Sequence, residues 1–96
     1  MSELEAAITP RTRVILLNTP HNPTGWVMPE NQAHELKAIL DRHEQVLCIT
    51  DEVYDRLVFP PIKHTRLGSL PGMWDRVLTV GSAGKTFSVT GWKIGW

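Results

Sequence analysis

The sequence predicts an α/β fold built on a parallel sheet, and three observations carry this prediction. Three apolar runs, at residues 13–18, 46–50 and 76–80, are bounded by turn residues, which is typical of buried strands. A helical pattern between the first two runs completes a strand–helix–strand unit, in which the strands are parallel. Polar residues follow each run. Because parallel strands end at one edge of the sheet, these polar residues are expected to form a site there.

Composition limits the kind of protein. At 96 residues the chain is at most one small domain, and its 42% apolar content is that of an ordinary globular protein. Ten basic and ten acidic side chains cancel without forming a basic stripe, so no nucleic acid partner is expected. The apolar runs fall far short of the ~20 residues that span a bilayer, so no membrane partner is expected. The single cysteine, Cys48, and the lack of a recognisable secretory leader favour the cytoplasm.

The first half of the chain is expected to form a helix, a strand and a second helix. Residues 2–7 can form a short helix in which Ser2 and Glu5 are spaced as a capping box. The run at 13–18 is a continuous apolar stretch, the pattern of a strand buried on both faces. A longer helix is predicted for residues 29–43, with proline in its first turn, where the missing N–H is harmless. Its apolar face carries Ala33, Leu36, Ile39 and Leu40, together with the methylene stem of Lys37.

The second half is expected to contain two strands separated by loops. The second strand covers residues 46–50, and a short extended piece at 57–59 is cut by two prolines. Residues 62–75 are expected to be mostly loop, with a turn at Pro71-Gly72. The third strand covers residues 76–80.

Lys85 is the central candidate for chemistry. It lies in a glycine- and hydroxyl-rich turn directly after the third strand. An amine must be neutral to attack an aldehyde, whereas a free lysine is protonated near neutral pH. Imine formation with a cofactor, or a desolvated electropositive pocket, removes that obstacle. Ala83 and Gly84 are small enough to let a flat ring approach the backbone. Taken alone, Lys85 could also be a surface lysine in a loop.

Asp51, Tyr54 and Asn22 are the next candidates. A carboxylate at the end of an apolar strand is costly to bury unpaired, and a protonated pyridine nitrogen would be a suitable partner for Asp51. Tyr54 shares the face of Asp51 if Asp51 begins a helical turn, and Asn22 lies on a loop fixed by prolines. Their phenol and amide can hold an anionic ring oxygen. Taken singly, Asp51 could cap a helix and the other two could be structural; Glu52 is expected to face the other way.

Ser82, Ser88 and Lys93 supply hydroxyl and ammonium groups around the same turn. Loop N–H groups and a lysine form an anion site suited to phosphate, although Lys93 alone could be a solvated surface charge. A lysine, a carboxylate, two ring-oxygen donors and a phosphate site together indicate pyridoxal 5′-phosphate.

Two other kinds of site are disfavoured. The four histidines lack the spacing of metal ligands and Cys48 stands alone, so no metal is expected. Gly84-Lys85-Thr86 has the tail of a nucleotide-binding P-loop, but that motif needs a glycine at position 79, which is threonine. A nucleotide-binding module is therefore kept only as a less favoured alternative.

At these residues the chain resembles the fold-type-I pyridoxal-phosphate-dependent aminotransferases of class I/II. The similar motifs are Asn22-Pro-Thr-Gly25, Asp51-x-x-Tyr54 and Ser82-x-x-Lys85 with a cation at 93, and the resemblance covers essentially the whole chain. The run from Gly81 to Lys93 is most similar to the kynurenine/glutamine-transaminase and methionine-aminotransferase branch. The resemblance implies that residues 1–96 are part of the three-layer, parallel-sheet large domain, which binds the cofactor, with no complete second domain.

The resemblance also implies a role for each candidate. Lys85 holds the cofactor through an imine and then moves a proton between the substrate α-carbon and cofactor C4′. Asp51 pairs with the pyridine nitrogen, and Tyr54 and Asn22 bind the ring 3′-oxygen.

For the phosphate, the resemblance implies Ser82 and Lys93. Many relatives carry arginine at position 93; lysine keeps the charge but not the bidentate fork.

Relatives act on an amino acid and a 2-oxo acid and work as homodimers, so the parent protein is expected to do the same. The chain is expected to be a central piece of a longer enzyme and to be inactive in isolation. A truncated or vestigial segment with a structural or interaction role is the alternative. The sequence leaves open which amino donor and acceptor are used, and whether the reaction is transamination or β-elimination.

Overall fold

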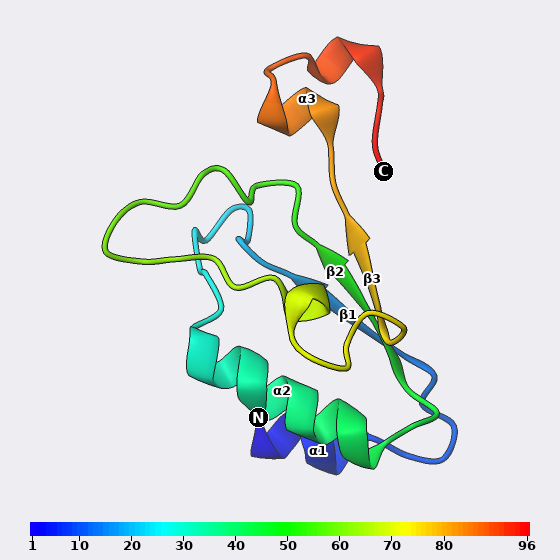
Figure 1. The fold of residues 1–96 in the computed structure, drawn as a ribbon. Coiled ribbons are helices and arrows are strands. Elements are labelled where there is room, and N and C mark those ends of the chain that lie inside the picture. Colours follow the sequence, from blue (N-terminus) through cyan, green and yellow to red (C-terminus); the bar gives the residue numbers. More distant parts are fainter.

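The chain folds around a three-stranded parallel sheet with strand order β1-β2-β3, as a computed structural model of residues 1–96 shows (Figure 1). The strands are β1 (Val14–Asn18), β2 (Leu47–Asp51) and β3 (Val77–Val80). The helices are α1 (Ser2–Ala7), α2 (Glu30–Arg42) and α3 (Ala83–Thr86), with short 3-10 turns η1 (Leu67–Ser69) and η2 (Thr90–Trp92). The predicted α/β class and the crossover through the long helix are confirmed, and each strand begins one residue later than predicted.

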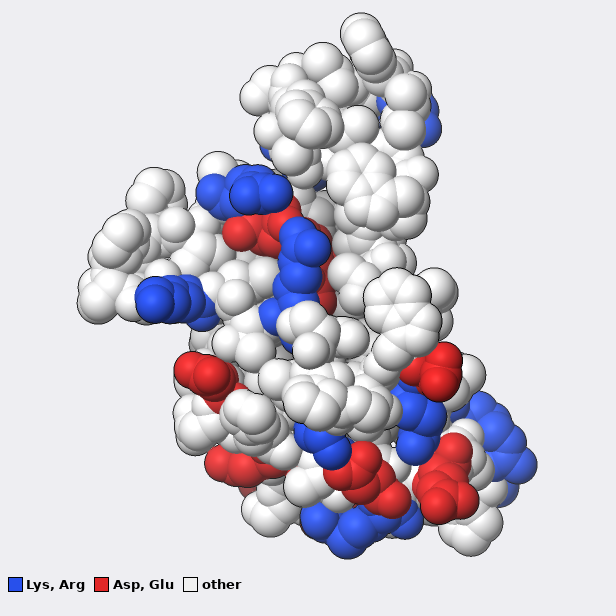
Figure 2. All heavy atoms as spheres, viewed as in Figure 1, with Lys and Arg blue, Asp and Glu red and all other residues white.

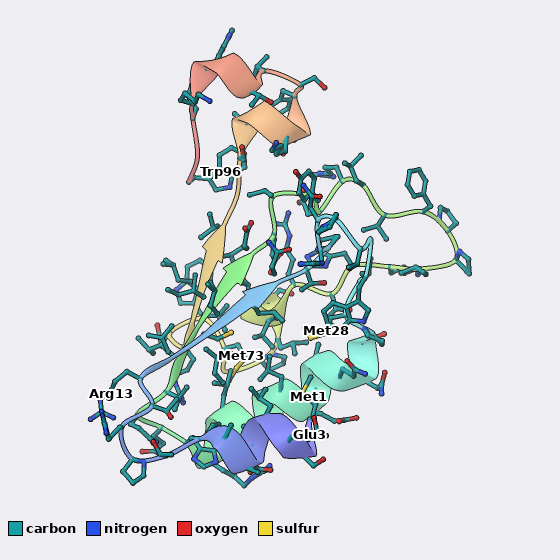
Figure 3. All side chains as sticks on the ribbon, turned by 180° about the vertical axis from the view of Figure 1, so that it is seen from behind. Met1, Glu3, Arg13, Met28, Met73 and Trp96 are labelled. Atoms are coloured by element: carbon teal, nitrogen blue, oxygen red, sulfur yellow. The ribbon has the colours of Figure 1, made fainter.

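The sheet has one covered face and one bare face. The covered face packs on α2 through a core in which Met28, Leu36, Leu40, Val46 and Cys48 are all buried. Met28 and Met73, labelled in Figure 3, lie between the sheet and α2. On the opposite face Leu16 is 74% exposed and Leu78 is 63% exposed. The prediction that the first strand is buried on both faces is therefore wrong within this chain, because both α1 and α2 lie on one side (Figures 1 and 3).

Helix α2 follows its predicted pattern closely. Ala33, Leu36, Ile39 and Leu40 are buried, while Lys37 is half-buried and its ammonium lies 2.6 Å from the Asp41 carboxylate. Pro29 is the N-cap residue rather than a residue of the first turn.

The end of α2 is fastened to the start of β3 by one arginine. The Arg76 Nη2 atom donates to the backbone carbonyls of Leu40, His43 and Val46 at 3.1, 3.1 and 2.6 Å. A cation at a helix C-terminus satisfies carbonyls that have no partner within the helix and is favoured by the helix dipole. Arg76 therefore holds the crossover helix and the third strand in a fixed relation.

The predicted capping box at the start of the chain is corrected by the structure. Helix α1 has the predicted bounds, but Met1 is its N-cap and no side-chain capping bond forms. Glu5 instead accepts a hydrogen bond of 2.8 Å from Arg42 Nε, and this bond, with the charges of Arg42 and His43, lowers the pKa of the Glu5 carboxyl. Residues 57–59 form no strand.

The turn predicted at Pro71-Gly72 is present, with a φ of +79° at Gly72. None of the helices is both long and apolar enough to cross a bilayer. In the view of Figure 2, acidic and basic side chains are interspersed over the lower part of the molecule. The C-terminal part, at the top of the view, shows few charges.

Candidate active site

The carboxyl ends of the three strands lie level at one edge of the sheet. In the parallel register Asn18 pairs with Asp51, and Asp51 pairs with Val80. The chain leaves this edge three times, and the three departing segments carry Asn22, Tyr54 and Lys85. The topology thus brings segments that are more than 60 residues apart in sequence to one edge.

Asp51 is the last residue of β2 rather than the residue after it. Its Oδ2 accepts a hydrogen bond of 3.0 Å from Asn18 Nδ2, and its Oδ1 accepts one of 3.3 Å from the Val53 N–H. Residues 53–56 form turns, so Asp51 does not cap a helix. Both carboxylate oxygens are held, and the orientation of the group is therefore fixed on the bare face of the sheet.

Asn18 was not among the predicted site residues. Its Nδ2 binds Asp51, while its Oδ1 is buried and has no hydrogen-bond partner. Buried acceptors are almost always satisfied, so this atom marks a place where a donor is missing from the chain. One feature of the sequence could have identified it: Asn18 is the polar residue at the end of the first apolar run, just as Asp51 follows the end of the second.

Asn22 and Tyr54 lie in direct contact. Asn22 Nδ2 donates to Tyr54 Oη at 3.0 Å, which leaves the phenol hydrogen free to donate elsewhere. The helical turn that would place Tyr54 on the face of Asp51 does not form: Asp55 N–H bonds to the Glu52 carbonyl and Leu57 N–H to that of Tyr54, as in turns. The segments around Asn22 and Tyr54 line a depression of about 310 Å³. Its lining residues are Pro20, His21, Asn22, Pro23, Gly25, Tyr54 and Leu57.

Lys85 extends toward the same pair. Its Nζ lies 5.5 Å from the centroid of the Tyr54 ring, within the range of a cation–π contact. The turn that carries it is closed by Thr90, whose hydroxyl donates to the Gly84 carbonyl at 3.2 Å. A Cβ at Gly84 would lie 2.9 Å from the Thr90 Cα, so the close approach requires glycine. Lys85, Tyr54 and Asn22 therefore form one connected cluster.

Ser82 and Lys93 lie on neighbouring segments. The chain returns antiparallel to the turn: Ala83 N–H bonds to the Ile94 carbonyl at 3.1 Å, and Ser82 is bridged to Gly95. Figure 3 shows Trp96 folded back beside the segment that leaves β3. The side chains of Ser82 and Lys93 make no hydrogen bond or ion pair, and Ser88 and Lys93 adopt left-handed φ values of 58° and 55°.

No group of three or more His, Cys, Asp or Glu side chains is placed to hold a metal ion. Cys48, the one thiol, is buried on the covered face of β2, away from the candidate residues. Burial, with the nearby Glu52 carboxylate, raises the pKa of the Cys48 thiol to about 12. A thiol of this kind is inert as a nucleophile.

A sequence model of the class I and II aminotransferases matches residues 1–96, the whole chain. The chain belongs to this family. Rat kynurenine–oxoglutarate transaminase 3 is 54% identical over 94 residues, a match that covers 98% of this chain and 20% of that protein. Human kynurenine–oxoglutarate transaminase 1 is 53% identical over 94 residues, covering 98% of this chain and 22% of that protein.

Solved aminotransferase structures share the fold. N-succinyldiaminopimelate aminotransferase from Mycobacterium tuberculosis superposes with a TM-score of 0.93 at 44% identity, covering 99% of this chain and 24% of that one. The chain thus spans about a fifth to a quarter of the length of the aminotransferases it matches. The resemblance to a fragment of a fold-type-I aminotransferase is confirmed, and these findings give no support to a nucleotide-binding module.

Class I and II aminotransferases depend on pyridoxal 5′-phosphate, and the donor set at this edge fits that group. The Asp51 carboxylate is the acceptor that a protonated ring nitrogen needs, and the side chain that binds this carboxylate, Asn18, carries a buried acceptor without a partner. The free phenol hydrogen of Tyr54 suits an anionic ring oxygen, and the Lys85 amine lies over the same phenol ring. The depression of about 310 Å³ lies on the Asn22 and Tyr54 side of this donor set and is not lined by Asp51 or Lys85.

Proposed function

We propose that this chain is the cofactor-holding part of an enzyme that moves an amino group from an amino acid to a 2-oxo acid with pyridoxal 5′-phosphate. The single observation that carries the proposal is the Lys85–Tyr54–Asn22 cluster, at the sheet edge where Asp51 ends β2, in a chain that belongs throughout to the aminotransferase family.

Each side chain has a distinct part in the proposal. Lys85 would bind the cofactor aldehyde covalently, with loss of water. Once the substrate amine has displaced it, the freed Lys85 amine would take the proton from the substrate α-carbon as general base and return it as general acid. Asp51 holds the proton on the ring nitrogen, and Asn18 orients that carboxylate. The bound pyridinium ring supplies an electron sink for the pair left when the α-carbon loses its proton.

Tyr54 and Asn22 donate to the ring 3′-oxygen. Two neutral donors would stabilise an oxyanion there without adding charge. They would thereby lower the proton affinity of the nitrogen that is bonded to the cofactor's aldehyde carbon, next to the 3′-oxygen. Ser82 and Lys93, whose side chains make no hydrogen bond or ion pair within the chain, bind the phosphate group.

The substrates, the oligomeric state and the cellular location of the parent protein are also proposals. The names of the relatives supply kynurenine and oxoglutarate as the first donor and acceptor to test. We infer a homodimeric parent from the aminotransferase family to which the chain belongs. We place it in the cytoplasm because the one cysteine is buried and unpaired, and we expect no nucleic acid or membrane partner because the charges are balanced and the apolar runs are short. The isolated chain is proposed to be inactive, since it spans about a fifth of its relatives.

The experiment is chemical trapping at the lysine. The chain is incubated with pyridoxal 5′-phosphate, reduced with borohydride and mapped by mass spectrometry. Label on Lys85, rather than on Lys37, Lys63 or Lys93, supports the proposal. Lys63→Ala is the matched control and should keep the label, whereas Lys85→Ala should lose it. A label on any other lysine, equal in the two variants, would refute the role of Lys85.

Activity is measured separately. Kynurenine and oxoglutarate are supplied to the chain with cofactor, and no turnover is expected. Turnover that is lost in Lys85→Ala would contradict the proposed inactivity of the isolated chain while supporting the amino-transfer chemistry.

A further inference from the structure

Tyr54 sits on a long loop that contains no helix or strand. Residues 52–66 run from the end of β2 to the start of η1 without regular structure, and such loops are uncommon unless they serve a function. The loop surrounds a hollow of about 540 Å³ lined only by residues between 55 and 66, so its middle does not pack on the body of the protein. Phe59, near the tip, is 75% exposed. Something other than a packed core must hold the loop.

The two ends of the loop are held together by a buried pair of side chains, Glu52 and His64. The side chains of Glu52 and His64 are 3% and 6% exposed, and Glu52 Oε2 lies 2.8 Å from His64 Nε2. Because a carboxylate oxygen only accepts, Nε2 carries the hydrogen and donates. A carboxylate so deeply buried is costly without a partner, so the two side chains depend on each other.

Arg66 extends this contact toward the surface. Its Nε lies 3.7 Å from Glu52 Oε2, and its Nη2 donates to Asp55 Oδ2. Figure 2 shows acidic and basic side chains in contact in the middle of the view, where the loop leaves the sheet. Residues 52 and 55 are thus tied to residues 64 and 66, and Tyr54 lies between the two tied positions.

The Tyr54 side chain makes two polar contacts. Its phenol oxygen accepts one hydrogen bond, from Asn22, and its ring faces the Lys85 ammonium at 5.5 Å. Both of these polar contacts are with side chains on other segments, and the one backbone hydrogen bond of Tyr54, from the Leu57 N–H, lies within the loop. The contacts that connect the backbone on either side of Tyr54 to residues 64 and 66 are those of Glu52 and Asp55.

We propose that Glu52 and His64 are positioning residues for Tyr54: their buried pair, with Arg66, holds the start of the loop so that the phenol faces Asn22 and Lys85. The inference rests on the proposed function only for what Tyr54 does once it is in place. It gives a role to Glu52, which lies next to Asp51 but takes no part in the cofactor site itself.

The test uses the fact that Tyr54 is the only tyrosine among the 96 residues. The chain is labelled with ring-¹³C tyrosine and its single aromatic signal is recorded without cofactor. In His64→Leu the signal should move to the position of free tyrosine, while the circular dichroism spectrum and the exchange protection of the Thr50 amide remain unchanged. His64→Gln, whose amide can still donate to Glu52, should retain at least half of the original displacement. His34→Leu, the same change on an exposed position of α2, should leave the signal in place.

Arg66→Gln is the second variant, needed if His64→Leu does not fold. Arg66 is 54% exposed, so this change spares the buried pair and should shift the Tyr54 signal part of the way. A Tyr54 signal that stays at its wild-type position in His64→Leu, or in Arg66→Gln where the former does not fold, overturns the inference, whatever the result of trapping at Lys85. If the Tyr54 signal moves but Lys85 takes no cofactor label, the proposed function is refuted and the positioning role of Glu52 and His64 is supported.

Discussion

Arg76 offers the sharpest test of how the fold is held together. One nitrogen of its guanidinium donates to three carbonyls, of which the contact to Val46 is the shortest at 2.6 Å. That nitrogen has two hydrogens, so at most two of the bonds are well directed at a time. A hydrogen bond to a charged group contributes about 1.5–3 kcal/mol, and a cation at a helix end adds about 0.3–1 kcal/mol. Arg76 is half-buried, so in the variant water can bond to some of the carbonyls that lose the guanidinium. Arg76→Met should therefore lower the free energy of unfolding by about 2–4 kcal/mol.

The assay is urea unfolding followed by far-UV circular dichroism. Arg76→Lys keeps the charge but not the planar guanidinium, and it should recover about half of the loss. Arg56→Met is the matched control, because Arg56 is 74% exposed and only loosely paired with Asp55 at 3.8 Å; it should change stability by less than about 0.5 kcal/mol. Equal midpoints for Arg76→Met and Arg56→Met would refute the reasoning.

Two further predictions concern the buried thiol and the lysine turn. Because the pKa of Cys48 is raised from 9.0 to about 12, the unfolded chain ionises first. The free energy of unfolding should therefore fall by about 1.4 kcal/mol per pH unit above pH 9.0, a slope that Cys48→Ala should lack. Native chain should also resist iodoacetamide at pH 8, and rapid alkylation without unfolding would contradict this burial. Gly84→Ala places a Cβ 2.9 Å from the Thr90 Cα, so borohydride labelling of Lys85 should drop, whereas Gly91→Ala, with open space around it, should label normally.

The arrangement of the site edge could be predicted from the sequence because it follows from chain order. Apolar runs specify strands, and a helix between two of them makes those strands parallel. Asn22, Tyr54 and Lys85 were therefore expected at one edge, and the structure shows Asn22 bonded to Tyr54 and Lys85 over its ring. Their roles toward a cofactor stay a proposal.

Other features depend on contacts that no local pattern encodes. Glu5 is spaced for a capping box with Ser2, but Arg42, 37 residues away, competes successfully for its carboxylate. Asn18 became visible as a partner of Asp51 only when the register of the parallel strands was known.

The bare face of the sheet shows a different limit. Leu16 and Leu78 are apolar because they belong to a strand pattern with two apolar faces, yet this chain covers only one of them. Apolar runs show that a strand is suited to burial, but not which segment buries it.

The most direct measurement is a crystal structure of the chain after reaction with pyridoxal 5′-phosphate and borohydride. The account predicts a ring attached to Lys85, with its nitrogen against the Asp51 carboxylate and its 3′-oxygen against Tyr54 and Asn22. A ring attached to Lys85 but directed away from the sheet edge, with Asp51 bonded only to Asn18 and the Val53 N–H, would contradict it.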